Sequence, residues 1–233
     1  MLQDSKTGLV GNGETVQFED TFTSNWVPTK GWTWIREDKT AWSSTSSGLE
    51  LVANAGTIWP AHTSSADLSS TMLLRSLGDV ADGVEVELTN DAKLFGEQAG
   101  LWLYKDDENW VKWVSEGMKD GSVKLVFASK IAGKASMICK VPLPGNNPEQ
   151  PVILRLELLD GKVSAVVDRK VCLQHIATTD GNFLLADNVT SGFQVAIACH
   201  GGDGTRSVAF RRFATYAIAD GRGRLGPSST VSP

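Results

Sequence analysis

Residues 98–116 show a clear alternation of apolar and polar positions and predict two strands joined by a polar turn. Side chains alternate across a strand with period two, so one face would carry Leu101, Leu103, Val111 and Trp113, and the other would carry Trp102, Tyr104, Trp110, Lys112 and Glu116. A wholly apolar face belongs in a core. An aromatic face with a lysine and a glutamate suits a ligand-binding surface, although ordinary sheet packing also accounts for each residue alone.

Short runs with the character of strands recur along the chain and are separated by turn residues. They cover residues 15–18, 31–37, 48–52, 72–75, 84–88, 122–129, 152–158, 162–167, 192–200 and 207–216. We find no convincing helical periodicity and no internal repeat. This pattern indicates an all-β fold, either a barrel or a two-sheet antiparallel sandwich, and we favour a curved sandwich with a concave aromatic face.

The 233 residues fit one large β domain, which we place at residues 16–218. Residues 1–15 and 219–233 are polar and glycine-bearing, so we expect flexible ends. Residues 59–71 lack periodicity and carry small polar side chains, which is typical of a surface loop. This loop is the natural candidate for a lid over a pocket.

Composition excludes several partners. The net charge is −5 and no basic run occurs, so we expect neither nucleic acid nor a membrane as partner. Cys139, Cys172 and Cys199 are odd in number and lack metal spacing, which favours free thiols. The chain has no signal-like segment, so we expect a soluble cytoplasmic protein. The sequon at residues 188–190 keeps secretion open as an alternative.

The motifs of common enzyme classes are missing from the sequence. No phosphate-binding glycine loop, no histidine pair with metal spacing and no nucleophile elbow occurs, so we expect no cofactor and no metal. Glu85 and Glu87 share one strand face and could suggest glycoside hydrolysis, which needs two carboxylates. A solvated strand face explains alternating glutamates better, so hydrolysis is disfavoured.

Arg36, Arg75 and Arg155 each fall within apolar strands, where a guanidinium needs partners. They could pair with glutamates in a structural network. Alternatively, Arg36 and Arg75 could point into the same concavity as Trp34 and Trp102 and donate to an oxygen-rich ligand. His200 ends a strand at a glycine-rich turn, where side chains often line a rim.

Several motifs in order resemble a known family. They are Phe18-Glu19-Asp20-Thr21-Phe22, Gly31-Trp32-Thr33-Trp34-Ile35-Arg36-Glu37, Gly48-Leu49-Glu50-Leu51, Gly56-Thr57-Ile58-Trp59, Leu73-Leu74-Arg75, Gln98 to Lys112, and Val208-Ala209-Phe210-Arg211-Arg212-Phe213. Residues 16–216 thereby resemble the concanavalin A-like β-sandwich of family 43 β-xylosidases and of DUF1349 (regulation-of-enolase-like) proteins. The resemblance implies a jelly roll with a lectin-like shape. The closing strand departs from the pattern, because Arg211-Arg212 stands where an acidic residue is common, which argues against calcium near Asp20.

Two main hypotheses of function follow, because fold does not fix function. In the first, the concave face binds a glycan or other small molecule through Trp34, Trp102, Tyr104 and Trp110, with polar contacts from Arg36, Arg75, Lys112, Gln194 and His200. In the second, the same pocket belongs to a cofactor-independent cyclase or pericyclase, similar to a Diels-Alderase, that acts on a hydrophobic natural product. Arg36 or Arg75 would then polarise a carbonyl as the catalytic residue. A protein-interaction or regulatory domain is the third alternative.

Overall fold

The computed structural model describes residues 9–10, 14–28, 31–59, 71–77, 82–89, 92–143, 150–159, 162–168, 173–180 and 194–218. Sixteen strands cover most of these residues and form two antiparallel sheets. No helix occurs in this part of the chain, so none of the described residues forms a helix able to cross a membrane. The predicted all-β antiparallel sandwich is confirmed.

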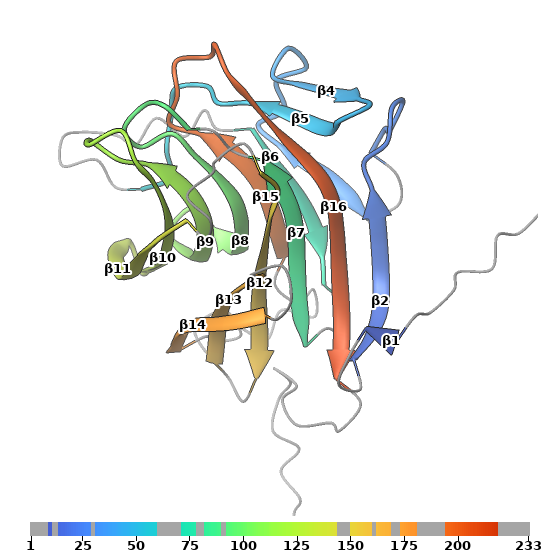
Figure 1. Cartoon of the computed structure of the whole chain (residues 1–233), viewed down its shortest axis with the longest axis vertical. Coiled ribbons are helices and arrows are strands. Elements are labelled where there is room, and N and C mark those ends of the chain that lie inside the picture. Colours follow the sequence, from blue (N-terminus) through green and yellow to red (C-terminus); the bar gives the residue numbers. More distant parts are fainter. Residues whose placement is uncertain are drawn as a thin grey trace, which may run out of the picture.

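One sheet has seven strands. They are β3 (Trp32–Ile35), β6 (Met72–Ser76), β8 (Gln98–Asp106), β9 (Asn109–Gly117), β10 (Val123–Ile131), β11 (Lys134–Pro142) and β15 (Gln194–His200). Their order across the sheet is β11-β10-β9-β8-β15-β6-β3. Figure 1 shows β8, β9 and β10 in green, curving beside one another. The central strands β8, β9 and β15 therefore have neighbours on both sides.

The other sheet has nine strands. They are β1 (Leu9–Val10), β2 (Glu14–Thr21), β4 (Trp42–Thr45), β5 (Gly48–Val52), β7 (Gly83–Thr89), β12 (Val152–Leu159), β13 (Lys162–Asp168), β14 (Leu173–Asp180) and β16 (Ser207–Ile218). The main order is β1-β2-β16-β7-β12-β13-β14, and β5 joins β4 to β16. The long strand β16, red in Figure 1, pairs with β2, β5 and β7 and ties the sheet together.

The main hydrophobic core lies between the two sheets. Leu101, Leu103, Val111 and Trp113 of the β8–β9 hairpin are buried there against residues of the nine-stranded sheet such as Leu154. The Trp113 indole donates a hydrogen bond to the Val166 carbonyl, 2.9 Å away, so the one polar atom of this large side chain is satisfied. The predicted core face of the hairpin is confirmed.

Four of the described strands were not expected from the sequence: β1, β4, β11 and β14. The residues of β11 are mostly exposed or half-buried, because this strand is the edge of its sheet. An edge strand with little buried surface shows no strong apolar alternation, which is the signal used to predict strands. β14 is likewise the last strand of its sheet.

Several expectations lie largely outside the described residues. Only residues 59 and 71 of the expected lid are described, and the sequon at 188–190 and the expected tail at 219–233 are not. Within the segment expected to be flexible, β1 pairs with the start of β2 through Leu9 opposite Thr15. Cys139 and Cys199 carry free thiols, and Cys172 lies outside the described part.

Candidate ligand-binding site

The face of the seven-stranded sheet that points away from the other sheet, here called the outer face, carries a second cluster of buried residues. Strand register places its central side chains in four rows that run across β15, β8, β9 and β10. In order, the rows are His200-Gln98-Glu116-Lys124, Ala198-Gly100-Val114-Val126, Ala196-Trp102-Lys112-Ala128 and Gln194-Tyr104-Trp110-Lys130. Polar and aromatic side chains therefore gather in three rows around one row of small residues.

Large side chains lean across the row of small residues. The rings of Trp102 and His200 lie 5.3 Å apart between centroids, and Lys112 Nζ donates to Gln98 Oε1 at 2.5 Å. Gly100 has a φ of +155°, and a Cβ at this position would lie only 2.5 Å from the Trp113 carbonyl oxygen. Glycine is therefore required here, and the polar groups of neighbouring rows come together above it.

The outer face is covered rather than open. Trp102 and Trp110 are fully buried and Lys112 is only 3% exposed. Ile58 and Trp59 pack on this cluster, and the Trp59 ring lies 5.9 Å from Trp110 and 4.9 Å from Lys112 Nζ. The expected aromatic surface is thus present, but it lies beneath a segment that follows β5 instead of forming an open platform.

Several buried polar atoms on this face have no hydrogen bond partner in the described part of the chain. Seven such atoms occur among the described residues, and three of them are Trp102 Nε1, Trp110 Nε1 and His200 Nδ1. A buried polar group without a hydrogen bond costs about 1–3 kcal/mol, so native proteins rarely leave several together without a reason. These three atoms are available to a bound molecule.

Burial also perturbs the titratable groups of the outer face. It lowers the pKa of Lys112 to about 8, with Glu116 opposing this shift and the charge of Lys140 adding to it. Burial, and then the charges of Lys112 and Arg36, lower the pKa of His200 to about 3. His200 is therefore neutral at pH 7, and Lys112 titrates close to neutral pH. Such perturbed groups in one cluster are typical of functional sites.

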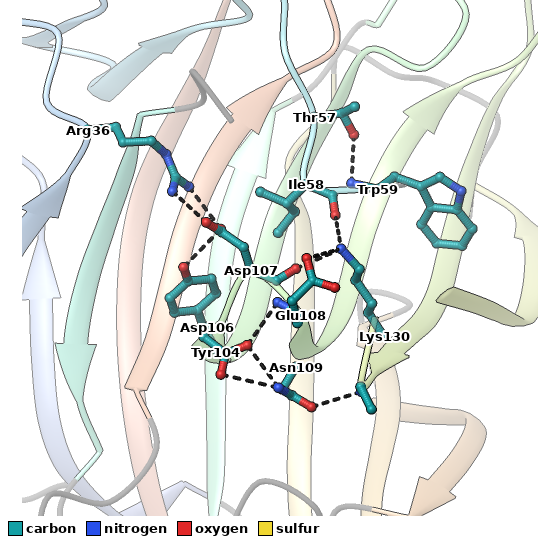
Figure 2. A network of polar contacts seen from close by, with 11 residues as sticks. Arg36, Thr57, Ile58, Trp59, Tyr104, Asp106, Asp107, Glu108, Asn109 and Lys130 are labelled. Atoms are coloured by element: carbon teal, nitrogen blue, oxygen red, sulfur yellow. Dashed lines mark hydrogen bonds and ion pairs between the residues drawn. The ribbon is translucent and has the colours of Figure 1, made fainter. Parts of the chain in front are cut away.

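An ion pair between Arg36 and Asp107 lies at one side of the outer face. Figure 2 shows Arg36 reaching Asp107 in the β8–β9 turn, with Nη1 to Oδ2 at 3.0 Å and Nη2 to Oδ1 at 3.3 Å. The Tyr104 hydroxyl donates to the same carboxylate at 2.9 Å, and burial together with this hydrogen bond raises the pKa of Tyr104 to about 12. Asp107 accepts a hydrogen bond from each of the two terminal nitrogens of Arg36, so this ion pair ties the end of β3 to the β8–β9 turn.

Lys130 fixes the segment with Ile58 and Trp59, here called the cover, to the β8–β9 turn. Its Nζ donates to the Asp107 carbonyl at 2.9 Å, to Glu108 Oε1 at 3.0 Å and to the Ile58 carbonyl at 3.4 Å (Figure 2). The lysine side chain is buried, so these three contacts use all of its donors. The segment with Ile58 and Trp59 is thereby held over the outer face.

The structure brings together only part of the predicted site. Trp102, Tyr104, Trp110, Lys112 and His200 share the outer face, and the register places Gln194 in the same row as Tyr104. Arg36 reaches this face as well, because its φ of +52° breaks the strand alternation after Ile35.

The structure places Trp34 and Arg75 on the opposite face of the sheet, which corrects the prediction that both belong to the site. Trp34 pairs with Leu73, stacks on Trp42 at 5.2 Å and packs against the core between the sheets. The Arg75 guanidinium lies 3.3 Å from the centre of the Phe18 ring. The alternation of β6 explains this, because Met72 and Leu74 take the outer face and Arg75 follows Leu73 inward.

Asp20 does not fit a calcium site. Its carboxylate accepts hydrogen bonds from the indoles of Trp26 and Trp32 at 2.9–3.1 Å, and it interacts electrostatically with Arg75. Donors and a cation thus occupy the place that a metal ion would need. No group of three or more metal-binding side chains occurs in the described part of the chain.

The glutamate pair on β7 belongs to a structural network. Glu85 is bound by Arg212, and Glu87 lies 3.9 Å from Arg211. Arg155 is buried and pairs with Glu14 at 2.5 Å and with Glu157 at 3.2 Å, as the structural alternative expected. With guanidinium groups as partners, these carboxylates are not arranged as a hydrolytic acid and base.

Sequence reasoning missed Gln98, Asp107 and Ile58 as parts of the site. Gln98 could have been found, because it has the same strand parity as Trp102 and Tyr104. Asp107 and Ile58 lie in a turn and in a segment without periodicity, and their positions depend on long-range packing that no local pattern encodes.

The geometry is that of a concanavalin A-like β-sandwich, and comparisons with known proteins agree. The family model of the β-xylosidase C-terminal concanavalin A-like domain matches residues 19–216. The chain therefore belongs to this family, and the predicted resemblance to the xylosidase domain is confirmed. The comparisons do not name DUF1349, so that part of the resemblance stays a prediction. Comparison with curated proteins finds no match.

Solved structures share the fold at low sequence identity. A mutant GH43 protein from Bacillus licheniformis matches with a TM-score of 0.72 and 19% identity over 86% of this chain, and a xylan β-1,4-xylosidase from Bacillus halodurans matches with a TM-score of 0.71 and 19% identity over 85%. This chain covers only 39% and 38% of those two proteins. A functionally unknown protein from Saccharomyces cerevisiae matches at 18% identity and a TM-score of 0.63, with 84% of this chain and 98% of that one covered.

Proposed function

We propose that this protein binds a carbohydrate on the outer face of its seven-stranded sheet. The observation that carries the proposal is the cluster of unpartnered buried atoms formed by Trp102 Nε1, Trp110 Nε1 and His200 Nδ1. A sugar offers hydroxyl groups that donate and accept hydrogen bonds, and its C–H faces pack on indole rings. Such a ligand would satisfy atoms that the chain itself leaves without partners.

The relatives support a carbohydrate more than another small molecule. The matching family model is named for β-xylosidases, and one similar structure is a xylan β-1,4-xylosidase. Because those proteins are much longer than this chain, their activity does not transfer with the domain. Binding without hydrolysis also agrees with the ion-paired state of Glu85 and Glu87. The cyclase hypothesis and the regulatory hypothesis stay predictions, since no specific contact favours either.

Binding requires the cover to move, because Trp102 and Trp110 are fully buried. Ile58 is 1% exposed within the outer-face cluster, its carbonyl accepts a hydrogen bond from Lys130, and Trp59 packs on Trp110 and Lys112. A ligand must displace these contacts by local opening of the segment before it can take the segment's place. We expect the ligand to lie between Trp59 and the row that contains Trp102 and Lys112.

The proposal is tested with ¹⁵N-labelled protein and a panel of xylo-, cello-, manno- and galacto-oligosaccharides that includes uronic acid oligomers. The indole N–H signals are followed by NMR and assigned with the variants Trp102→Phe, Trp110→Phe and Trp34→Phe. We expect a member of the panel to shift the Trp102 and Trp110 signals. The Trp34 signal is the control, because its Nε1 is also buried and unpartnered but lies on the other face. No shift with any member, or a shift confined to Trp34, overturns the proposal.

A further inference from the structure

Among the described residues, two of the three unpartnered buried atoms on the outer face are only hydrogen bond donors, and the third, His200 Nδ1, is a donor or an acceptor according to the tautomer of the neutral imidazole. The indole Nε1 atoms of Trp102 and Trp110 can only donate. The acceptor of Gln98 is already taken by Lys112, and its amide nitrogen donates to the Gly96 carbonyl at 3.2 Å. A ligand that matches this face must therefore be rich in acceptors.

Among the described residues, the charges on this face are also unbalanced toward positive. Arg36 is neutralised by Asp107, and Lys130 by Glu108. In the part of the chain that the structure describes, Lys112 has one carboxylate nearby, Glu116 at 3.6 Å, which is longer than a hydrogen bond. Register places Lys140 beside Val126 on the same face, where its charge acts on Lys112. The charges that act on His200 are those of Lys112 and Arg36, both positive.

Hydrogen bond donors, the Lys112 ammonium group and two indole rings thus lie together on this face. From this juxtaposition we infer that the site selects an acidic carbohydrate, a sugar whose carboxylate is bound by Lys112. This inference rests on the proposed function and specifies its ligand class. Lys112 stands directly opposite Trp102 in the sheet and two residues from Trp110 on its own strand. A carboxylate at Lys112 thus places the sugar ring against the two indoles. An ammonium–carboxylate contact in a buried site is stronger than a contact with a neutral hydroxyl.

Glu116 competes with the ligand for Lys112. It is the carboxylate found near Nζ among the described residues, and its side chain is 12% exposed, so it can turn toward water when a ligand binds. Removing its charge should therefore strengthen the binding of an acidic sugar and leave a neutral sugar unaffected.

The test compares a β-1,4-linked glucose trisaccharide with the same trisaccharide oxidised to carboxylate at each C6. Titration calorimetry at pH 7 is carried out on the full chain and on Lys112→Gln, Glu116→Gln and the control Lys134→Gln, which changes an exposed lysine of β11. We expect the acidic form to bind at least tenfold more tightly than the neutral form. Lys112→Gln should remove most of this preference, Glu116→Gln should increase it severalfold, and Lys134→Gln should leave it unchanged.

Equal or tighter binding of the neutral trisaccharide overturns the inference but leaves the proposed function standing. An acid preference that survives in Lys112→Gln also overturns it, provided that thermal unfolding shows the variant to be folded. If neither trisaccharide binds, the inference fails, and the proposed function fails with it only when the whole oligosaccharide panel leaves the Trp102 and Trp110 indole signals unmoved.

Discussion

The Trp102 indole and the His200 imidazole lie 5.3 Å apart between ring centroids, and neither Trp102 Nε1 nor His200 Nδ1 has a hydrogen bond partner among the described residues. Both side chains are almost completely buried. The pair stands beside a second buried pair, Lys112 and Gln98, which does make a hydrogen bond. The chain therefore supplies hydrogen bond partners for Lys112 and Gln98, whereas Trp102 Nε1 and His200 Nδ1 are left for a ligand.

His200 should make the protein sensitive to acid. Its pKa is lowered from 6.5 to about 3, so below pH 6.5 the unfolded chain binds a proton that the folded protein does not. The contribution of His200 to stability is fully present above pH 6.5 and is lost as the pH falls toward 3. Relative to pH 7, the wild type should lose on the order of 3 kcal/mol more than His200→Asn by pH 4. Urea unfolding of both proteins at the two pH values measures this difference, and equal losses would contradict it.

Lys112 should reduce stability at neutral pH. Its folded pKa of about 8 lies below the ordinary 10.5, so protonation favours the unfolded chain. Wild-type stability should rise as the pH increases from about 8 to 10.5, because only the unfolded state then keeps the proton. At pH 7 we expect Lys112→Met to be more stable by about 2 kcal/mol, after allowance for the lost hydrogen bond to Gln98.

The gain from Lys112→Met should vanish above pH 10.5. The groups that face Lys112 are Glu116, Lys140, His200 and the amide of Gln98, and the variant leaves them in place. Lys134→Met is the matched control on an exposed lysine and should change stability by less than about 0.5 kcal/mol. A marked loss of stability in Lys112→Met at pH 7 would show that Lys112 supports the fold instead of serving a ligand.

Lys130 should contribute strongly to stability, in contrast to Lys112. Lys130→Met removes the donor for the carbonyls of Asp107 and Ile58 and for Glu108. The two carbonyls then lose a charge-assisted partner, and we expect a loss of about 2–4 kcal/mol in the free energy of unfolding. Urea denaturation at pH 7 gives the value. A loss below about 0.5 kcal/mol would mean that Lys130 does not hold the cover over the outer face.

The β8–β9 hairpin was predictable because both of its faces carry a strong period-two signal. Leu101, Leu103 and Trp113 lie in the core between the sheets, and Trp102 lies on the other face, as the alternation indicated. Arg75 was misplaced because its face is set by strand pairing with β15 and β3, which the residues of β6 alone do not reveal. The cover formed by Ile58 and Trp59 could not be predicted, since it depends on the contact with Lys130, 72 residues away in sequence.

The most direct test of the central claim is the affinity of three proteins for the tightest-binding oligosaccharide of the panel, measured by titration calorimetry. The wild type, Trp102→Phe and Trp34→Phe differ only in one indole, on the outer face or on the opposite face. We expect Trp102→Phe to bind about tenfold more weakly, because one hydrogen bond is lost, and Trp34→Phe to bind within twofold of the wild type. Equal affinities of the wild type and Trp102→Phe would contradict a ligand site on the outer face.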